Sequence, residues 1–398
     1  MTNAPASVHD GKPDDTPGIG SNWPAVLSLA MGIFGLVVAE YLPASLLTPM
    51  AEALVISEGQ AGQAVTATAG VALVSALIVP VLLRRTDRRL ILLAFTTFLI
   101  LSNVLAAMAE SLSVLLAARV LLGVALGGFW ALAAALSMRL VRGEHVPRAL
   151  SLIFSGVPVA LISGAAAGSY LGGLFGWRAV FLIAAGFGLA ALLVQAMTLP
   201  TLASTRPTPL SAVFRLLTRR GIGVGILAVV MVFTGHFILF TYIRPFLETV
   251  SGAGIARIST TLLIFGIANF AGTLLAGLLL AGNLRLTLSA MPAVIALVAV
   301  GLVTLGGASA MLDKGLIAVW GLAFGAVPVG WSTWITRTVP DEAEGAGGLL
   351  GASVQGAITI GAAAGGWLYD ARGLPAAFMA SAVILAAAVL VIGKRVRT

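Results

Sequence analysis

Apolar stretches of about twenty residues alternate with short polar segments along nearly the whole chain. At about 1.5 Å per helical residue, each stretch is long enough to cross a hydrocarbon layer of about 30 Å. We predict an all-α membrane protein with twelve transmembrane helices, because barrel strands would be shorter and would alternate polar with apolar residues. The predicted spans are 25–48, 61–83, 90–109, 114–138, 149–173, 178–199, 221–247, 256–281, 287–310, 315–338, 348–369 and 374–393.

Polar segments divide this pattern into two groups of six spans. Residues 1–22 are polar and rich in Pro, Gly and Asp, which predicts a disordered cytoplasmic tail rather than a signal peptide. The longest interior break, 200–220, contains three prolines and four arginines and predicts a cytoplasmic linker. It separates an N-terminal half, 23–199, from a C-terminal half, 221–393, which a short cytoplasmic tail, 394–398, follows.

Two short motifs repeat between these halves. Gly-x-Ala-x-Gly at 123–127 in the fourth span recurs at 321–325 in the tenth, an offset of 198 residues. Gly-Ala-Ala-Ala-Gly at 164–168 in the fifth span recurs at 361–365 in the eleventh, at an offset of 197. The shared offset indicates two six-helix pseudo-repeats, and parallel repeats are typical of transporters that rock one half against the other.

The positive charges predict the orientation of the spans. With the amino terminus inside the cell, 17 of the 23 Lys and Arg residues fall on inner segments and five fall on outer ones. Because cytoplasmic loops carry the excess of positive charge, both termini are expected in the cytoplasm.

Composition excludes several classes of protein. With 59% hydrophobic and 10% charged residues, the chain is neither a soluble enzyme nor a disordered protein, and the absence of cysteine excludes disulfides and thiolate ligands. The net charge of +8 does not indicate nucleic-acid binding, because the basic residues lie in short loops. No phosphate-binding loop, metalloprotease motif or nucleophile elbow is present, so we expect no ATP-driven pump, no enzyme, no metal site and no cofactor.

Three ionisable residues lie inside predicted spans at a similar depth. Glu40 is in the first span, where a charge costs roughly 2.5–3.5 kcal/mol and burial favours the protonated carboxyl group. Arg119 in the fourth span and His236 in the seventh reach about the same level, counted along the helices. We predict that the three residues couple protons to transport; the alternative is a structural ion pair beside a core histidine.

Aromatic residues in the fourth, seventh and tenth spans favour a planar ligand. Stacking a nucleobase on an aromatic ring is worth roughly 1–3 kcal/mol per base. The alternative is that these rings are interfacial anchors or packing residues. The predicted cargo contacts are Phe129, Trp130, Phe240, Asn269, Trp331, Ser332 and Trp334.

Three motifs resemble those of the major facilitator superfamily, in particular its drug:proton antiporters. Arg-Arg-Thr-Asp-Arg-Arg at 84–89 resembles the acidic–basic loop motif, with Leu83 in place of its leading glycine. Arg119 ahead of Leu-Gly at 122–123 resembles the arginine motif of the fourth span. The stretch 168–178 resembles the antiporter motif of the fifth span, with Ala166 in place of its usual proline. The resemblance implies alternating access, with Asp87, Arg88 and Arg89 at a cytoplasmic gate.

Four further stretches, 40–50, 126–130, 241–245 and 327–337, are similar to exporters of purine ribonucleosides within that superfamily. This resemblance implies export of inosine- or guanosine-like nucleosides in exchange for protons, by a monomer in a bacterial inner membrane. Sugar or drug efflux is the nearer alternative, since His236 and the stretch around Tyr242 also resemble sugar-efflux relatives. A passive channel or a membrane receptor is the more distant one.

Overall fold

The computed structural model describes residues 21–83, 85–142, 145–202, 215–219, 221–339 and 343–396. Most of the tail predicted at 1–22 and of the linker predicted at 200–220 lies outside these residues. Within them, the chain forms α-helices joined by short turns. Eleven of the described helical segments are long and apolar enough to cross a membrane; the fifth predicted span is α6, whose apolar part is the shorter stretch Val159–Phe175.

Every predicted span corresponds to a helix or to a pair of consecutive helices. The helices of the N-terminal half are α1 (Trp23–Ser45), α2 (Leu47–Leu54), α3 (Glu58–Leu82), α4 (Arg88–Ala107), α5 (Leu112–Leu140), α6 (Val146–Phe175) and α7 (Trp177–Thr198). The helices of the C-terminal half are α9 (Ile222–Thr241), α10 (Ile243–Thr249), α11 (Ile255–Gly282), α12 (Leu284–Leu305), α13 (Ala310–Thr338), α14 (Ala343–Arg372) and α15 (Leu374–Arg395).

Capping residues and turn glycines set several helix ends. Ser57 and Gln60 form a capping box at the start of α3, in which each side chain accepts a hydrogen bond from the other residue's backbone N–H. Asn283 caps α12 through Leu286 N at 2.9 Å. Gly176 and Gly373 separate α6 from α7 and α14 from α15 with φ of 81° and 79°, a conformation that favours glycine.

The first and seventh spans, predicted as continuous helices, are each broken near one end. The breaks lie at Leu46, between α1 and α2, and at Tyr242, between α9 and α10. Each short helix carries a proline at its third position, Pro49 or Pro245. Because proline has no N–H, the carbonyl group four residues earlier loses its helical partner, which weakens the helix at that point.

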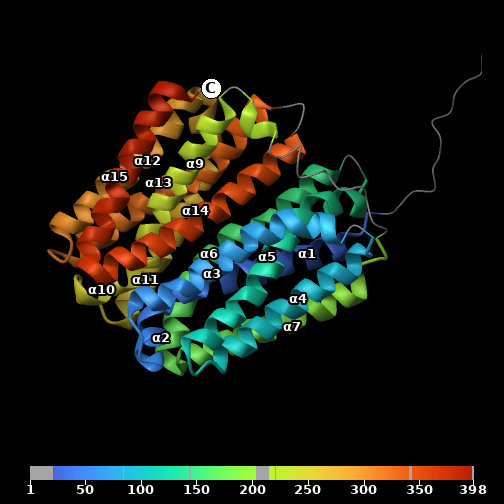
Figure 1. Cartoon of the computed structure of the whole chain (residues 1–398), viewed down its shortest axis with the longest axis horizontal. Helices are drawn as coiled ribbons and strands as arrows, with labels where there is room; N and C mark the ends of the chain where they lie inside the picture. Colours follow the sequence, from blue (N-terminus) through green and yellow to red (C-terminus); the bar gives the residue numbers. More distant parts are fainter. Residues whose placement is uncertain are drawn as a thin grey trace, which may run out of the picture.

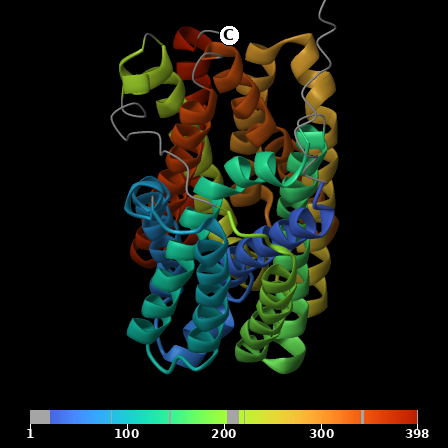
Figure 2. The same ribbon diagram turned by 90° about the vertical axis from the view of Figure 1, so that its right-hand side faces the viewer.

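The two halves pack their helices in the same pattern. In the first half α1 lies on α6, α3 on α5 and α4 on α7; in the second, α9 lies on α14, α11 on α13 and α12 on α15. The repeated Gly-x-Ala-x-Gly motif lies where α5 crosses α3 and where α13 crosses α11. A Cβ at Gly127 would overlap the Ala72 carbonyl, and one at Gly325 would overlap the Asn269 carbonyl. The halves occupy separate regions of the molecule (Figures 1 and 2).

The halves meet along two helix pairs, α3 with α14 and α6 with α11. These pairs correspond to one another under the repeat, so the interface has the same approximate symmetry as the halves. The short helices α2 and α10 lie at the end of the bundle away from the C terminus (Figure 1), and we call this the far end. The α2 and α10 helices contact each other there.

Candidate proton and cargo site

Glu40 lies on α1 at the interface between the halves. Its side chain is 6% exposed, and its Oε1 accepts a hydrogen bond from Gln355 Nε2 of α14 at 3.4 Å. A carboxylate that is desolvated and held by one amide is costly, and adding a proton relieves that cost. The position is therefore suited to reversible protonation, and Gln355 links it directly to the other half.

Arg119 on α5 is fully buried beside the same turn of α1. Its Nη2 donates to the Ala39 carbonyl oxygen at 3.0 Å and its Nε to Thr68 Oγ1 at 3.2 Å. The Ala39 carbonyl is free to accept because Pro43, four residues later, has no N–H. The guanidinium group also lies 5.5 Å from the centre of the Phe181 ring.

The carboxyl group of Glu40 and the guanidinium of Arg119 are neighbours without a direct ion pair. Both side chains belong to the described part of the chain, and none of their oxygen and nitrogen atoms is paired with the other side chain. Arg119 Nη1 has no hydrogen-bond partner. Arg119 therefore places a positive charge near Glu40 and leaves the carboxylate free to take up a proton.

His236 on α9 lies in an aromatic pocket of the second half. Its Nδ1 accepts a hydrogen bond from Trp320 Nε1 at 3.1 Å, which identifies a neutral ring whose proton is on Nε2. The ring stacks on Phe324 with centroids 3.3 Å apart and on Phe240 at 5.6 Å. No hydrogen bond joins His236 to Glu40 among the described residues, so the predicted three-residue relay has no continuous path in this conformation.

Tyr41, which sequence reasoning did not select, carries the aromatic contact across the interface. Its ring stacks on Phe237 of α9 at 6.2 Å with an interplanar angle of 11°, and meets Phe240 edge-on at 5.4 Å. Tyr41 follows Glu40 directly in the chain. The predicted cargo contact Phe240 thus joins the His236 pocket to Tyr41 and lies close to the candidate proton site.

The structure places the other predicted cargo contacts away from this group. Phe129 packs inside the first half against Gly32. Trp331 and Trp334 pack edge to face at 5.4 Å, and Trp334 fills the space beside Gly225. Their contact with cargo stays a prediction, because the described residues show no contact between them and Glu40.

The remaining predicted contacts differ in burial. Asn269 is buried between α11 and α13, where its Nδ2 donates to the Gly321 carbonyl at 3.5 Å. Trp130 is partly buried against the core of the first half. Ser332 is exposed on the surface of α13. Their roles also stay predictions.

The predicted cytoplasmic gate residues hold the α3–α4 turn against the rest of the first half. Asp87 accepts from Arg89 N at 2.8 Å and from Leu202 N at 3.0 Å. Arg88 Nη1 donates to the Leu83 carbonyl at 3.1 Å, and Arg89 Nη2 donates to the Ala196 carbonyl at 2.7 Å. These contacts stay within the first half and the start of the linker, so a gating contact with α14 stays a prediction.

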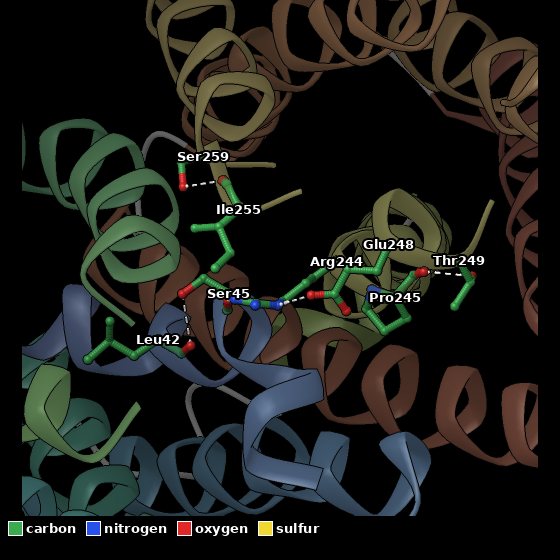
Figure 3. Close-up of polar contacts among 8 residues, drawn as sticks. All are labelled: Leu42, Ser45, Arg244, Pro245, Glu248, Thr249, Ile255 and Ser259. Atoms are coloured by element: carbon green, nitrogen blue, oxygen red, sulfur yellow. Dashed lines mark hydrogen bonds and ion pairs between the residues drawn. The ribbon is translucent and has the colours of Figure 1, made fainter. Parts of the chain in front are cut away.

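At the far end, a buried arginine joins the halves (Figure 3). Arg244 of α10 donates through Nη1 to the Ser45 carbonyl oxygen and through Nε to Glu248 Oε1 at 2.8 Å. The Ser45 carbonyl lacks its helical partner because Pro49 has no N–H. A cation at this position also complements the negative C-terminal end of α1.

A second contact at the far end has the opposite charge. Asp370 of α14 accepts from Ser57 Oγ at 2.6 Å and from Gly59 N at 3.1 Å, at the N-terminal end of α3. An anion is favoured there by the exposed N–H groups and the helix dipole. Gly62 on α3 and Gly366 on α14 make room for the Tyr242 side chain between these two helices, because a Cβ at either position would overlap its hydroxyl group. The second half thus closes on the first at the far end with one cation and one anion.

Comparison with known proteins identifies the family. The model described as Major Facilitator Superfamily matches residues 27–347. The chain belongs to the Major Facilitator Superfamily. It is 45% identical, over 94% of its length and 95% of the relative's, to the purine ribonucleoside efflux pump NepI of Escherichia coli O6:K15:H31. The pump of the same name from Escherichia coli K12 is 44% identical over the same shares.

Solved structures give the same fold. The D-xylose–proton symporter superposes with a TM-score of 0.75 at 16% identity, covering 95% of this chain and 98% of its own. A bacterial homologue of the human lysosomal transporter Spinster has a TM-score of 0.72 at 15% identity, covering 92% and 95%. The predicted family and all-α fold are confirmed. The protein is a multi-pass membrane transporter of the superfamily, with bacterial relatives, and not an enzyme.

Proposed function

We propose that this transporter is a proton-coupled antiporter that exports purine ribonucleosides such as inosine and guanosine from a bacterial cell. The observation that carries the proposal is the position of Glu40, a buried carboxyl group on the first half whose hydrogen-bond partner belongs to the second. A proton bound there changes a contact between the halves. The cargo class is supported by the relatives, which are named for purine ribonucleoside efflux.

The orientation follows from the distribution of positive charge. With both termini in the cytoplasm, the far end is the periplasmic side, and Arg244 and Asp370 close the pathway toward the periplasm. In this arrangement the cargo enters from the cytoplasm. The gate formed by Asp87, Arg88 and Arg89 closes the other side after the halves have rocked.

Cargo is exchanged for a proton because cargo binding and protonation of Glu40 exclude one another. Cargo binds from the cytoplasm while Glu40 is ionised, and Arg119 stabilises that charge. After the halves rock, a proton from the periplasm neutralises Glu40 and the cargo leaves; the proton is released on return. One charge crossing 100 mV supplies about 2.3 kcal/mol, enough for a gradient of about 40-fold in a neutral nucleoside.

The planar base of such a cargo has matching surfaces beside Glu40. Tyr41 from one half and Phe237 and Phe240 from the other present aromatic rings at the interface. A base stacked there touches both halves, so its presence and the protonation of Glu40 act on the same contact. His236 and Trp320 hold Phe324 and Phe240 in place behind this surface.

Transport in inside-out membrane vesicles tests the proposal. Vesicles with an acidic lumen are expected to accumulate radiolabelled inosine, and collapse of the pH gradient abolishes the accumulation. Unlabelled guanosine competes, whereas pentoses and cationic dyes do not. Competition by pentoses or dyes instead assigns the cargo to one of those classes.

The same vesicles separate an exchanger from a passive channel. An exchanger saturates with inosine concentration and accumulates it against a gradient, whereas a channel equilibrates inosine whatever the pH difference. Equilibration without saturation contradicts the proposal, because Glu40 then has no proton-coupled role.

A further inference from the structure

Gln355 makes the polar contact between the halves at mid-depth and leaves half of its amide unused. The side chain is 9% exposed and donates through Nε2 to Glu40 Oε1 at 3.4 Å. Its Oε1 is buried without a hydrogen-bond partner. A buried acceptor without a donor has lost its hydrogen bonds to water without replacement, so this oxygen favours any bound molecule that supplies an N–H or O–H group.

An amide group presents opposite chemistry on its two sides. The N–H₂ side donates to a carboxylate, whereas the C=O side accepts from a protonated carboxyl group. When Glu40 is ionised, Gln355 turns Nε2 toward it and Oε1 faces away. When Glu40 takes a proton, the favourable contact is reversed, and rotation of the amide about its last bond turns Nε2 away from Glu40.

We propose that Gln355 couples the protonation of Glu40 to cargo binding, by presenting an acceptor to the cargo when Glu40 is ionised and a donor when Glu40 is protonated. This inference rests on the proposed nucleoside–proton antiport. The donor on the cargo is N1–H of a 6-oxopurine base. Protonation of Glu40 sets this N1–H against the Gln355 amide N–H₂, and the cargo is released.

The exchange of protons balances without a further reactant. The proton comes from periplasmic water and binds a carboxylate oxygen of Glu40. After the halves rock, it is released into cytoplasmic water. The rotation of Gln355 transfers no proton. It requires no displacement of either helix, because only the terminal amide turns.

Other titratable groups near this contact do not replace Gln355. Arg119 on α5 and Tyr41 on α1 act electrostatically with Glu40, but both belong to its own half. His236 on α9 accepts a hydrogen bond from Trp320 and makes none with Glu40 in the described residues. The charged side chains of the other helices packed against α1 and α14 lie near helix ends in the described residues. Gln355 therefore transmits the change across the interface.

Equilibrium binding at two pH values tests the inference in the purified full-length protein. Wild type is expected to bind inosine about tenfold more tightly at pH 8.5 than at pH 5.5, because one buried hydrogen bond is lost on protonation. Binding of 1-methylinosine, which has no N1–H, is weaker at pH 8.5 and nearly independent of pH. In Gln355→Met, both the pH dependence and the difference between the two nucleosides disappear.

Controls separate a direct role from a general disturbance. Gln63→Met makes the same change at an exposed position of α3 and is expected to behave as wild type. If the N1-methyl group of 1-methylinosine weakens binding by steric clash, the affinity difference between the two nucleosides persists in Gln355→Met. If it weakens binding because a hydrogen bond to Gln355 is lost, that difference disappears. Thermal unfolding verifies the fold of each variant, and Gln355→Leu is the substitute if the methionine variant is unstable.

The failures of the two proposals are distinguishable. Wild type that binds inosine more tightly at pH 8.5, together with Gln355→Met that does the same, overturns the role of Gln355 and leaves the antiport standing. Wild type that does not bind inosine, or binds it equally at both pH values, overturns the proposed function and with it the inference.

Discussion

Glu40 in the first half and His236 in the second occupy equivalent positions of the repeat. Gly164 of α6 contacts Val38 and Tyr41 on either side of Glu40, and Gly361 of α14 contacts Thr234 and Phe237 on either side of His236. The helix crossings are therefore the same in both halves. The residue between the contacts is a carboxylic acid in one half and a neutral imidazole in the other.

The residues around these two positions differ in the same way, because those around Glu40 are polar or charged and those around His236 are aromatic. Thr68 on α3 accepts from Arg119, whereas its counterpart on α11, placed by the same glycine contact, is Phe265, which packs against His236. The first half thus carries charge, and the second carries an aromatic surface. Packing is shared by the repeat, while chemistry is divided between the halves. A cargo at the interface contacts both, as exchange of a proton for a planar solute requires.

Replacing Glu40 and His236 with the same amide is expected to have the largest effect and tests whether the first half alone carries the coupled proton. Glu40→Gln is expected to abolish gradient-driven inosine accumulation, so that a gradient of about 40-fold falls to equilibrium, because a neutral side chain binds no coupled proton. His236→Gln, the matched control, retains the accumulation. Uptake into inside-out vesicles measures both. If Glu40→Gln accumulates inosine as wild type does, the proton carrier is another residue.

The far-end closure is expected to depend on Arg244. Arg244→Gln removes a charged donor from the Ser45 carbonyl and from Glu248, which costs about 1.5–3 kcal/mol. The equilibrium between the halves is therefore expected to shift toward the form open at the far end by roughly 10- to 140-fold. The measurement is the distance between α2 and α10. Because the chain has no cysteine, spin labels attached at Glu52→Cys on α2 and Thr249→Cys on α10 report this distance directly.

Arg257→Gln provides the control for that measurement. Arg257 is an exposed arginine near the start of α11, and its substitution is expected to leave the distance distribution unchanged. A distribution in Arg244→Gln that matches wild type contradicts the assignment of Arg244 to the closure.

Shared packing predicts equal sensitivity of the two halves to added bulk. Gly127→Ala and Gly325→Ala each place a methyl group against a carbonyl oxygen of the neighbouring helix, and each is expected to lower the free energy of unfolding by about 1–3 kcal/mol. Gly186→Ala on α7 has open space around it and is expected to be neutral or slightly stabilising. Thermal unfolding in detergent measures all three. If only one half is destabilised, the two halves do not share the same packing at this motif.

The sequence predicts what depends on position along a helix. The depth of Glu40 and the repeat of the glycine motifs follow from counting residues, and the structure places these glycines at the helix crossings. Prolines identify carbonyl groups without a helical partner: Pro43 frees that of Ala39, and Pro49 frees that of Ser45. This signal was available in the sequence, but it does not say which arginine supplies the donor.

Contacts between the halves are what the sequence does not determine. Gln355, Asp370 and Tyr41 have no unusual depth or motif; each gains its role from a residue of the other half brought close by packing. Trp331 illustrates the converse, since a tryptophan suited to stacking on a ligand is here buried against Trp334 between helices of the same half. Residue type alone does not distinguish these two outcomes.

The smallest expected effect concerns the aromatic contact that joins the halves. Tyr41→Leu removes a ring that meets Phe237 and Phe240, and aromatic pairs are worth about 0.5–1.5 kcal/mol beyond their buried area. Inosine affinity is therefore expected to fall roughly 2- to 12-fold. Tyr41→Phe keeps the ring and is expected to bind as wild type does, since stacking does not need the hydroxyl group. Equal loss in both variants would assign the contribution of Tyr41 to its hydroxyl group, and the planar cargo would then be recognised by the aromatic residues of the second half.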